Sequence, residues 1–182
     1  MTRTYGTGVT RPHRRTLKNP VGRGKVVMFT TRPATHLDEA FLFDMLYQAL
    51  FVPPGHELFP RAVLEAPEIA HYVEGFGLHI DDIGFVAEAE GTRIGAAWVR
   101  LLQGDNRGYG YVDDDAPELT IAVVPEWRER GVGTALLTRL LEALPRISLS
   151  SDPRNPARRL YRRLDFKPVA HRATSVTMLR QP

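Results

Sequence analysis

The sequence predicts a single α/β (α+β) domain, in which helices flank one mixed central sheet of about six to seven strands. Apolar residues with the helical spacing of three and four alternate along the chain with short β-branched and aromatic runs, which are typical of strands. These patterns mix from end to end without internal repeats, as expected for one sheet covered by helices. A chain of 182 residues with 43% hydrophobic side chains is long enough to bury one core.

The first half of the chain predicts a strand followed by two helices. Residues 25–32, KVVMFTTR, have the β-branched and aromatic content of a strand. A helix is expected next, because apolar side chains recur every four residues from Phe41 to Ala49 and the VPPG sequence at 52–55 ends the pattern. A second helical segment is expected over residues 61–72.

The second half predicts the remainder of the sheet and two amphipathic helices. The expected elements are a β-hairpin at 84–102, a strand at 118–124, a helix at 132–144, a strand at 146–150, a helix at 155–164 and a last strand at 175–180. The first of these helices has a continuous apolar row from Val132 to Leu144. Pro156 suits the first turn of the second helix, where its missing N–H costs nothing.

The basic residues concentrate at the N-terminus. Residues 1–25 hold seven of the 24 Lys and Arg and no acid, so the remaining 17 basic residues face 21 Asp and Glu. We predict a basic, disordered tail at 1–24 and one domain at 25–182. A transit peptide, or translation starting at Met28, are the other interpretations of this segment. The domain itself is slightly acidic, which gives nucleic-acid binding little electrostatic support.

Composition excludes several classes of site. The chain has no cysteine, which excludes disulfides, thiolate nucleophiles and cysteine-ligated zinc. This fits a reducing compartment, and we expect a cytoplasmic protein. No apolar run approaches the roughly 18–20 residues that span a bilayer, so no membrane partner is expected. The six histidines lack the spacing of metal ligands, so no metal site is expected.

The sequence EWRERGVGTALL, at residues 126–137, has the features of an anion site. It connects a predicted strand to a predicted helix, whose first N–H groups lack internal partners and carry partial positive charge. Gly131 and Gly133 would let the backbone approach a phosphate oxygen, and Arg128 and Arg130 add formal charge nearby. A tight turn without a ligand is the alternative interpretation of the two glycines.

Other phosphate-binding motifs fit this turn less well. A P-loop needs a lysine after its last glycine, but Gly133 is followed by Thr134 and Ala135. A dinucleotide fingerprint needs a third glycine where Leu136 stands, although Asp152 lies at about the distance of a ribose-binding acid. The remaining pattern is RxxGxG at the start of an amphipathic helix.

With a second motif downstream, the sequence resembles the GNAT superfamily of acetyl-CoA-dependent N-acetyltransferases. IAVVPEWRERGVGTALL resembles the pyrophosphate-binding motif of that family, and NPARRLYRRLDF resembles its next motif. The two lie in the family's order and cover residues 117–168. Asp165 stands where the family usually has glycine, at a position that turns the chain; Asp tolerates left-handed backbone better than most residues. The resemblance implies a GNAT-like domain that uses acetyl-CoA as co-substrate and no metal.

The resemblance assigns a cofactor site. Backbone N–H groups from Arg130 to Thr134 would hold the pyrophosphate, and the end of the strand at 118–124 would splay from its neighbour and pair with the pantetheine arm. The implied cofactor-binding residues are Ala122, Val123, Val124, Arg128, Arg130, Gly131, Val132, Gly133, Thr134, Asn155 and Tyr161. Asn155 would contact the pantetheine arm, or cap the helix that follows it.

The resemblance also implies the groups that move protons. Tyr161 would protonate the departing thiolate, since a phenol and a thiol have pKa values of about 10 and 8.5. Tyr161 also fits an apolar stripe, so a core aromatic is the alternative. Glu118 is the candidate general base. The family's glutamate often lies one residue upstream, where this chain has Pro117, and a water-relayed base is the alternative.

The acceptor is expected opposite the cofactor, beside the loops at 50–60 and 103–116. The second loop contains three consecutive aspartates, Asp113 to Asp115, which could attract a cationic amine or simply be solvated. We therefore expect acetyl transfer directly to a primary amine of a small molecule or peptide, and the resemblance also allows a homodimer. The alternative function is a non-catalytic acyl-CoA-binding or regulatory module.

Overall fold

The computed structural model of the chain describes residues 13–15 and 28–182. The strands are β1 (His13–Arg15), β2 (Phe29–Pro33), β3 (Ile83–Ala89), β4 (Thr92–Arg100), β5 (Glu118–Val123), β6 (Ile147–Ser151), β7 (Lys167–His171) and β8 (Val176–Arg180). The α-helices are α1 (Glu39–Ala49), α2 (Pro67–Ala70), α3 (Val132–Ala143) and α4 (Arg158–Arg163), and the 3-10 helices are η1 (His36–Asp38), η2 (Arg61–Glu65), η3 (Gly104–Asn106) and η4 (Pro125–Trp127).

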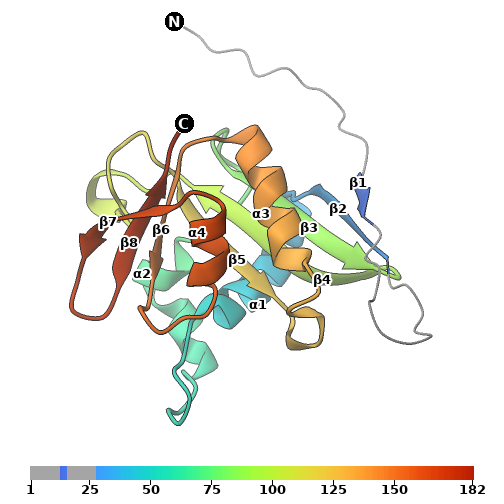
Figure 1. Cartoon of the computed structure of the whole chain (residues 1–182), viewed down its shortest axis with the longest axis horizontal. Helices are drawn as coiled ribbons and strands as arrows, with labels where there is room; N and C mark the ends of the chain where they lie inside the picture. Colours follow the sequence, from blue (N-terminus) through green and yellow to red (C-terminus); the bar gives the residue numbers. More distant parts are fainter. Residues whose placement is uncertain (1–12, 16–27) are drawn as a thin grey trace, which may run out of the picture.

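The strands form one mixed sheet in the order β1-β2-β3-β4-β5-β6-β8-β7 (Figure 1). Neighbouring strands are antiparallel except β5 and β6, which are parallel and are joined through α3. Seven of the strands lie in residues 28–182, and β1 adds three residues at the edge. The predicted α/β class and mixed sheet are confirmed. Apart from residues 13–15, the predicted disordered tail lies outside the described residues.

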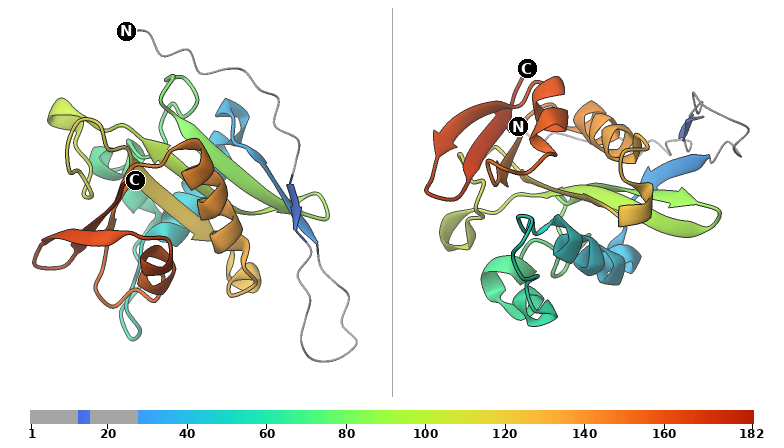
Figure 2. Two further views of the ribbon diagram at one scale, coloured as in Figure 1. Left: turned by 45° about the horizontal axis from the view of Figure 1, so that its top comes forward. Right: turned by 60° about the horizontal axis from the view of Figure 1, so that its bottom comes forward.

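Helices cover both faces of the sheet, because the strands bury alternate side chains on opposite sides. In β3, for example, Phe85 and Ala87 pack against α3, whereas Val86 packs against α1. Figure 2 (right) shows the sheet nearly edge-on, with α1 and α2 on one side and α3 and α4 on the other. Among the described residues, no helix is both long and apolar enough to cross a membrane.

Two local predictions need correction. The helix expected over residues 61–72 is a 3-10 turn followed by the four-residue α2, because Pro67 lacks the N–H and the space that a continuous helix needs. The strand β7 was not predicted. It is exposed throughout and contains Pro168, which is compatible with its place at the edge of the sheet.

The turns required by the sequence have the expected backbone. Glu90 and Gly91, between β3 and β4, have φ of 50° and 79°, which is the left-handed backbone of a tight hairpin turn. Asp165 has φ of 64°, so it adopts the left-handed conformation that the resemblance required of it. The chain can therefore turn from α4 into β7 without glycine at this position.

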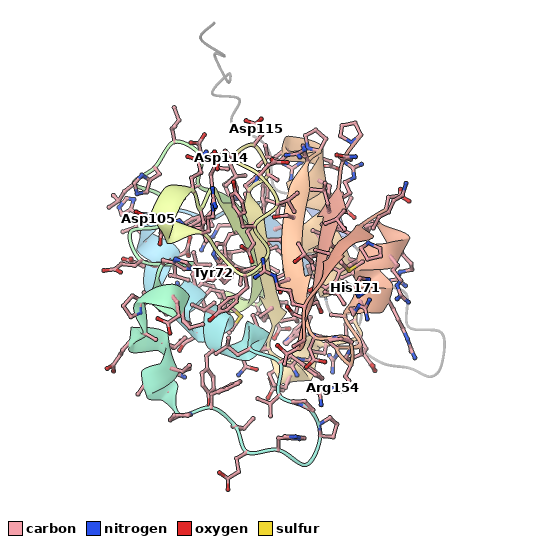
Figure 3. The ribbon with its side chains drawn as sticks, turned by 90° about the vertical axis from the view of Figure 1, so that its left-hand side faces the viewer. Tyr72, Asp105, Asp114, Asp115, Arg154 and His171 are labelled. Carbon is pink, nitrogen blue, oxygen red and sulfur yellow. The ribbon has the colours of Figure 1, made fainter. Side chains whose placement is uncertain are left out.

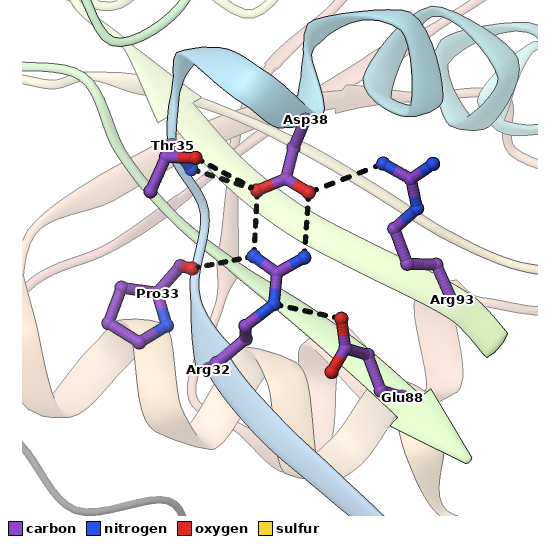
Figure 4. Close-up of polar contacts among 6 residues, drawn as sticks. All are labelled: Arg32, Pro33, Thr35, Asp38, Glu88 and Arg93. Carbon is purple, nitrogen blue, oxygen red and sulfur yellow. Dashed lines mark hydrogen bonds and ion pairs between the residues drawn. The ribbon is translucent and has the colours of Figure 1, made fainter. Parts of the chain in front are cut away.

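A buried carboxylate anchors the start of α1 to the sheet (Figure 4). Arg32 of β2 donates two hydrogen bonds to Asp38, of 2.7 and 2.8 Å, and a third of 2.8 Å to Glu88 of β3. The Thr35 N–H also donates to Asp38. Burial alone would raise the pKa of Asp38, but the bonds from Arg32 and Thr35 lower this pKa to about 2. This network fixes the helix that forms one wall of the site described below.

We predict that Asp38→Asn lowers the free energy of unfolding by about 2 kcal/mol, because one of the two acceptor oxygens becomes an NH2 group that faces the Arg32 guanidinium, and the opposing charge is lost. Asp44→Asn on the same helix is the matched control; its ion pair with Arg61 is exposed and should contribute at most about 1 kcal/mol. The folded pKa of Asp38 is depressed, so its contribution is present above about pH 4 and is lost as the pH falls toward 2. Urea unfolding of both variants at pH 7 and pH 3 measures this. Equal losses in the two variants at pH 7 would contradict the assignment.

Candidate functional site

The two parallel strands at the middle of the sheet separate toward one end. Their register is defined only at the pair Glu118 and Ser148, where the Ser148 N–H donates to the Pro117 carbonyl. Beyond this pair, β5 continues to Val123 without a partner on its β6 side among the described residues. This is the splay that the resemblance implied. It leaves backbone polar groups of β5 accessible between the strands.

The glycine turn lies at the end of β5 and starts α3. Gly131 has φ of 80° and ψ of 0°, the left-handed backbone that favours glycine, and no side chain caps the helix N-terminus. A Cβ at Gly133 would meet only Leu160 at 3.6 Å and Val123 at 3.8 Å, which are ordinary contacts. The protein's own packing therefore does not require glycine at position 133, whereas close approach of a ligand would.

A large cleft follows this turn across the molecule. It has a volume of about 1010 Å³ and lies between α1 with its following loop on one side and β5, α3 and α4 on the other. Of the predicted cofactor-binding residues, the cleft is lined by Ala122, Val123, Arg128, Gly131, Gly133, Thr134, Asn155 and Tyr161. The structure thus brings together two sequence motifs on one surface. Val124, Arg130 and Val132 do not line it.

The two arginines of the turn have different environments. Arg128 is held in place, because its Nε donates to the Val123 carbonyl and its guanidinium donates to Gln48 of α1. Arg130 is exposed and lies over the Trp127 ring, 5.3 Å from the ring centroid. Arg128 therefore connects α1 to the end of β5, which the sequence did not indicate, and Arg130 is a surface cation near the turn.

The backbone of β5 corrects part of the predicted pantetheine contact. The Val124 N–H donates to the carbonyl of Ile94 in β4. Because hydrogen-bonding direction alternates along an antiparallel ladder, Ala122 also directs its backbone groups to β4. Ile121 and Val123 face the opening instead. Val123 thus remains a candidate for pairing through its N–H, because its carbonyl accepts from Arg128. Ala122 uses its backbone groups within the sheet, and the Val124 carbonyl accepts from the Trp127 N–H of the following turn.

Tyr161 is a buried tyrosine with an unused hydroxyl. Its side chain is 7% exposed and packs in the core against Phe166, with ring centroids 5.9 Å apart. Burial raises the pKa of Tyr161 to about 12. Its hydroxyl has no hydrogen-bond partner among the described residues, and the residue lines two neighbouring cavities. Tyr161 is therefore both a core aromatic and a potential proton donor.

Asn155 also serves two purposes. Its side-chain oxygen accepts a hydrogen bond of 2.9 Å from the Ala157 N–H, which stabilises the turn before α4. Its amide nitrogen has no protein partner in the described part of the chain, and Asn155 lines both cavities. Asn155 therefore stabilises the turn that precedes α4 but is not the N-cap of this helix, which is Ala157 without a side-chain cap. Its amide nitrogen stays available to a ligand.

A second cavity, of about 370 Å³, meets the cleft at Tyr161 and Asn155. Its apolar side includes Phe51 and Phe59 from the loop after α1. Its polar side includes Glu118, together with serine and threonine residues from β6 and from the segment before β8. We refer to this space as the acceptor cavity and to the larger one as the cofactor cleft, after the ligands that we propose for them below.

Glu118 lies at the start of β5 and is 5% exposed. Its Oε1 atom accepts hydrogen bonds from the Tyr72 hydroxyl, at 2.9 Å, and from the Gly110 N–H, at 2.7 Å. Its Oε2 atom is buried and has no partner among the described residues. Burial raises the pKa of Glu118 to about 7, against the opposing effect of the two hydrogen bonds. A carboxylate with this pKa can accept a proton near neutral pH.

The sequence did not reveal the residues that hold Glu118. Tyr72 follows α2, and Gly108 and Gly110 belong to the RGYGY sequence of the loop before β5. A Cβ at Gly108 would lie 2.1 Å from Glu118 Oε2, and a Cβ at Gly110 would lie 2.7 Å from Oε1. The alternating glycines of this loop were the available signal. Among the described residues, no group of three or more acidic or histidine side chains is placed to hold a metal ion.

Comparison with known proteins agrees with the fold. A family model described as "Acetyltransferase (GNAT) domain" matches residues 81–168. No curated protein shows significant sequence similarity to the chain.

Many solved structures share the fold. Salmonella typhimurium yncA, a putative acetyltransferase with its cofactor acetyl-CoA, has a TM-score of 0.59 and 19% identity, over 84% of this chain and 93% of that one. The PaiA N-acetyltransferase of Thermoplasma acidophilum, in complex with coenzyme A, gives 0.57 and 14%, over 85% and 99%. The Escherichia coli ribosomal-protein-S18-alanine N-acetyltransferase gives 0.57 and 18%, over 84% and 93%. Residues 81–168 thus match the model of a GNAT acetyltransferase domain, and the chain shares its fold with solved acetyltransferases, two of which contain acetyl-CoA or coenzyme A.

Proposed function

We propose that the protein transfers the acetyl group of acetyl-CoA directly to a primary amine of a small molecule or peptide. The observation that carries this proposal is the meeting of two cavities at Tyr161, with a glycine turn in the larger and a carboxylate in the smaller. The cofactor cleft would bind the pyrophosphate at the N-terminus of α3 and the pantetheine arm beside Val123. The thioester would then lie next to Tyr161, facing the acceptor cavity.

In the proposed reaction the amine nitrogen bonds to the acetyl carbon and the carbon–sulfur bond breaks. The amine loses one proton toward Glu118, and the departing thiolate takes one from Tyr161. With the pKa of Tyr161 at about 12, transfer to a thiolate of ordinary pKa, about 8.5, is uphill. The same burial would raise the pKa of the thiol, so the two groups stay close enough for transfer during bond breaking.

The acceptor cavity supports the class of substrate. It is bounded by an apolar wall and contains one buried carboxylate, an arrangement that suits a small amine with an apolar substituent. We also propose a cytoplasmic location and a homodimer. The three aspartates, Asp113 to Asp115, lie in the loop before β5 and line neither cavity. Asp113 pairs with Arg146 through two hydrogen bonds, so it contributes little free charge.

The cofactor assignment is tested by ligand-dependent stability. A ligand that binds only the native state raises the melting temperature by mass action. We expect acetyl-CoA and CoA to raise it and NAD(H) to leave it unchanged. A response to NAD(H) without a response to acetyl-CoA would remove the proposed function. Binding without product formation from any amine would favour the alternative, a non-catalytic acyl-CoA-binding module.

We predict that Gly133→Asp lowers the affinity for acetyl-CoA by at least about tenfold, because the new carboxylate would face the pyrophosphate. The variant should fold normally, since a Cβ at this position meets only ordinary contacts and an acid suits the first turn of a helix. Ala143→Asp adds the same charge at the other end of α3 and serves as control. Calorimetric titration with acetyl-CoA measures both variants. Equal affinities would show that the pyrophosphate lies elsewhere.

A further inference from the structure

Neither oxygen of the Glu118 carboxylate is freely available to the acceptor cavity. Oε1 already accepts hydrogen bonds from the Tyr72 hydroxyl and the Gly110 N–H. Oε2 is buried without a partner, and Gly108 packs so closely that a Cβ there would lie only 2.1 Å away. An amine in the cavity therefore needs a group that can pass its proton to Glu118.

Tyr72 is the residue that connects the two. It lines the acceptor cavity and its hydroxyl donates to Glu118 Oε1 at 2.9 Å. The same hydroxyl oxygen accepts a hydrogen bond of 2.7 Å from the Tyr109 N–H. A phenolic oxygen has two lone pairs, so one remains for a hydrogen bond from a substrate amine or a bridging water.

The surrounding structure fixes the position of Tyr72. The Trp98 indole donates a 2.8 Å hydrogen bond to the Tyr72 backbone carbonyl. The His71 ring packs edge-to-face against the Tyr72 ring, with the ring centroids 4.6 Å apart. Figure 3 shows Tyr72 near the middle of this side of the molecule, with Arg154 and His171 across from it on C-terminal segments. Tyr72 lies on the face of the sheet that α1 and α2 cover, and the Glu118 side chain lies on the same face. Its hydroxyl is thus held between the cavity and the carboxylate.

We propose that Tyr72 relays a proton from the acceptor amine to Glu118, an inference that rests on the function proposed above. As the carbon–nitrogen bond forms, the amine proton moves to the Tyr72 oxygen while the Tyr72 hydroxyl proton moves to Glu118 Oε1. Tyr72 is neutral before and after, and Glu118 becomes the carboxylic acid. Tyr161 supplies the proton that the thiolate takes, and solvent returns the proton from Glu118 to Tyr161 after the products leave.

The electrostatic surroundings favour a relay over a tyrosinate base. Burial and the nearby Glu118 charge raise the pKa of Tyr72 far above its ordinary value. The phenol therefore does not ionise at any pH at which the enzyme would be assayed. Because Tyr72 gains one proton as it gives up another, no tyrosinate forms. This is consistent with the Glu118 carboxylate as the final proton acceptor.

The first test is Tyr72→Phe, assayed with an amine that the wild-type protein acetylates. We expect kcat to fall by about 10²-fold with unchanged affinity for acetyl-CoA, since Phe keeps the ring but removes the relay. The rising limb of the pH profile should also shift to higher pH, because the lost hydrogen bond had lowered the pKa of Glu118. Tyr111→Phe is the matched control. Its exposed hydroxyl also donates to a carboxylate, that of Asp114, but it lines neither cavity, and its kcat should be unchanged.

A double-mutant cycle tests whether Tyr72 acts through Glu118. The relay predicts that Tyr72→Phe causes no further loss of kcat when Glu118 is already Gln. If the losses of kcat in the two single variants multiply in the double variant, the relay is overturned. An unchanged kcat in Tyr72→Phe with a lowered melting temperature would also overturn it, because this result would show a structural role only. If the wild-type protein acetylates no amine, it is the proposed function that fails.

A third measurement leaves Tyr72 in place, so it does not depend on the folding of a variant at this position. In Tyr161→Phe, which lacks the proposed acid, rate constants for amine acetylation are measured across mixtures of H₂O and D₂O. Two protons moving together through the relay predict a curved dependence of the rate on deuterium content. A straight line would overturn the relay.

Discussion

Glu118→Gln is expected to lower kcat/KM for the amine by about 10²- to 10⁴-fold, because the amide cannot accept the proton that the amine must lose. In the wild-type protein kcat/KM should rise with pH around a midpoint near 7, the pKa to which burial raises Glu118. The rise reflects ionisation of the carboxylate, and it should be absent in the variant. Stopped assays of acetylated product from pH 5.5 to 9 measure both effects.

The same substitution should leave stability intact. The amide oxygen of Gln can still accept the hydrogen bonds from Tyr72 and Gly110. Ionised Glu118 is a buried charge whose pKa is raised in the folded state, so its ionisation opposes folding as the pH rises above its unfolded value of about 4.3. The variant should therefore melt at the same or a higher temperature at pH 8. A lower melting temperature with activity lost in proportion would indicate a structural role.

Tyr161→Phe is the second large effect, with kcat expected to fall by about 10²-fold while acetyl-CoA affinity stays unchanged. Phe retains the packing against Phe166 and removes only the hydroxyl, which has no partner among the described residues. Because the pKa of Tyr161 is about 12, no falling limb from its ionisation should appear below about pH 11 in the wild-type protein. Single-turnover kinetics isolate the chemical step.

A wild-type rate of the chemical step in Tyr161→Phe would contradict this role for Tyr161. The thiolate would then leave without help from this phenol, and Tyr161 would be only a core aromatic. Tyr47→Phe is a suitable control. Tyr47 also lines the cofactor cleft, but its hydroxyl donates to the backbone carbonyl of Phe59. Its loss should change the chemical step little.

The sequence predicted those features that depend on residues near one another in the chain. The two apolar runs on either side of the Glu90-Gly91 turn define a hairpin locally, and Gly131 lies where the backbone must be left-handed. The glycine turn and Tyr161 could be placed on one site only because two motifs resembled those of one family. Their common lining of the cofactor cleft agrees with that placement.

Features that depend on distant contacts were not predictable in this way. Tyr72 and Glu118 are 46 residues apart, and nothing in the local pattern of either indicates their hydrogen bond. The edge strand β7 lacks an apolar alternation because its side chains are exposed, and its pairing with β8 depends on the turn between them. The role of Arg128 in holding α1 likewise depends on Gln48, 80 residues away.

The most direct test of the account is to follow acetyl transfer itself, by mass spectrometry of the amine and by release of the CoA thiol in the same reaction. Small primary amines with apolar substituents are incubated with acetyl-CoA and wild-type protein, with Glu118→Gln as the control. We predict one acetylated amine formed for each thiol released, and almost none of either with the variant. Thiol release without an acetylated amine, or equal product from the variant, would contradict the account.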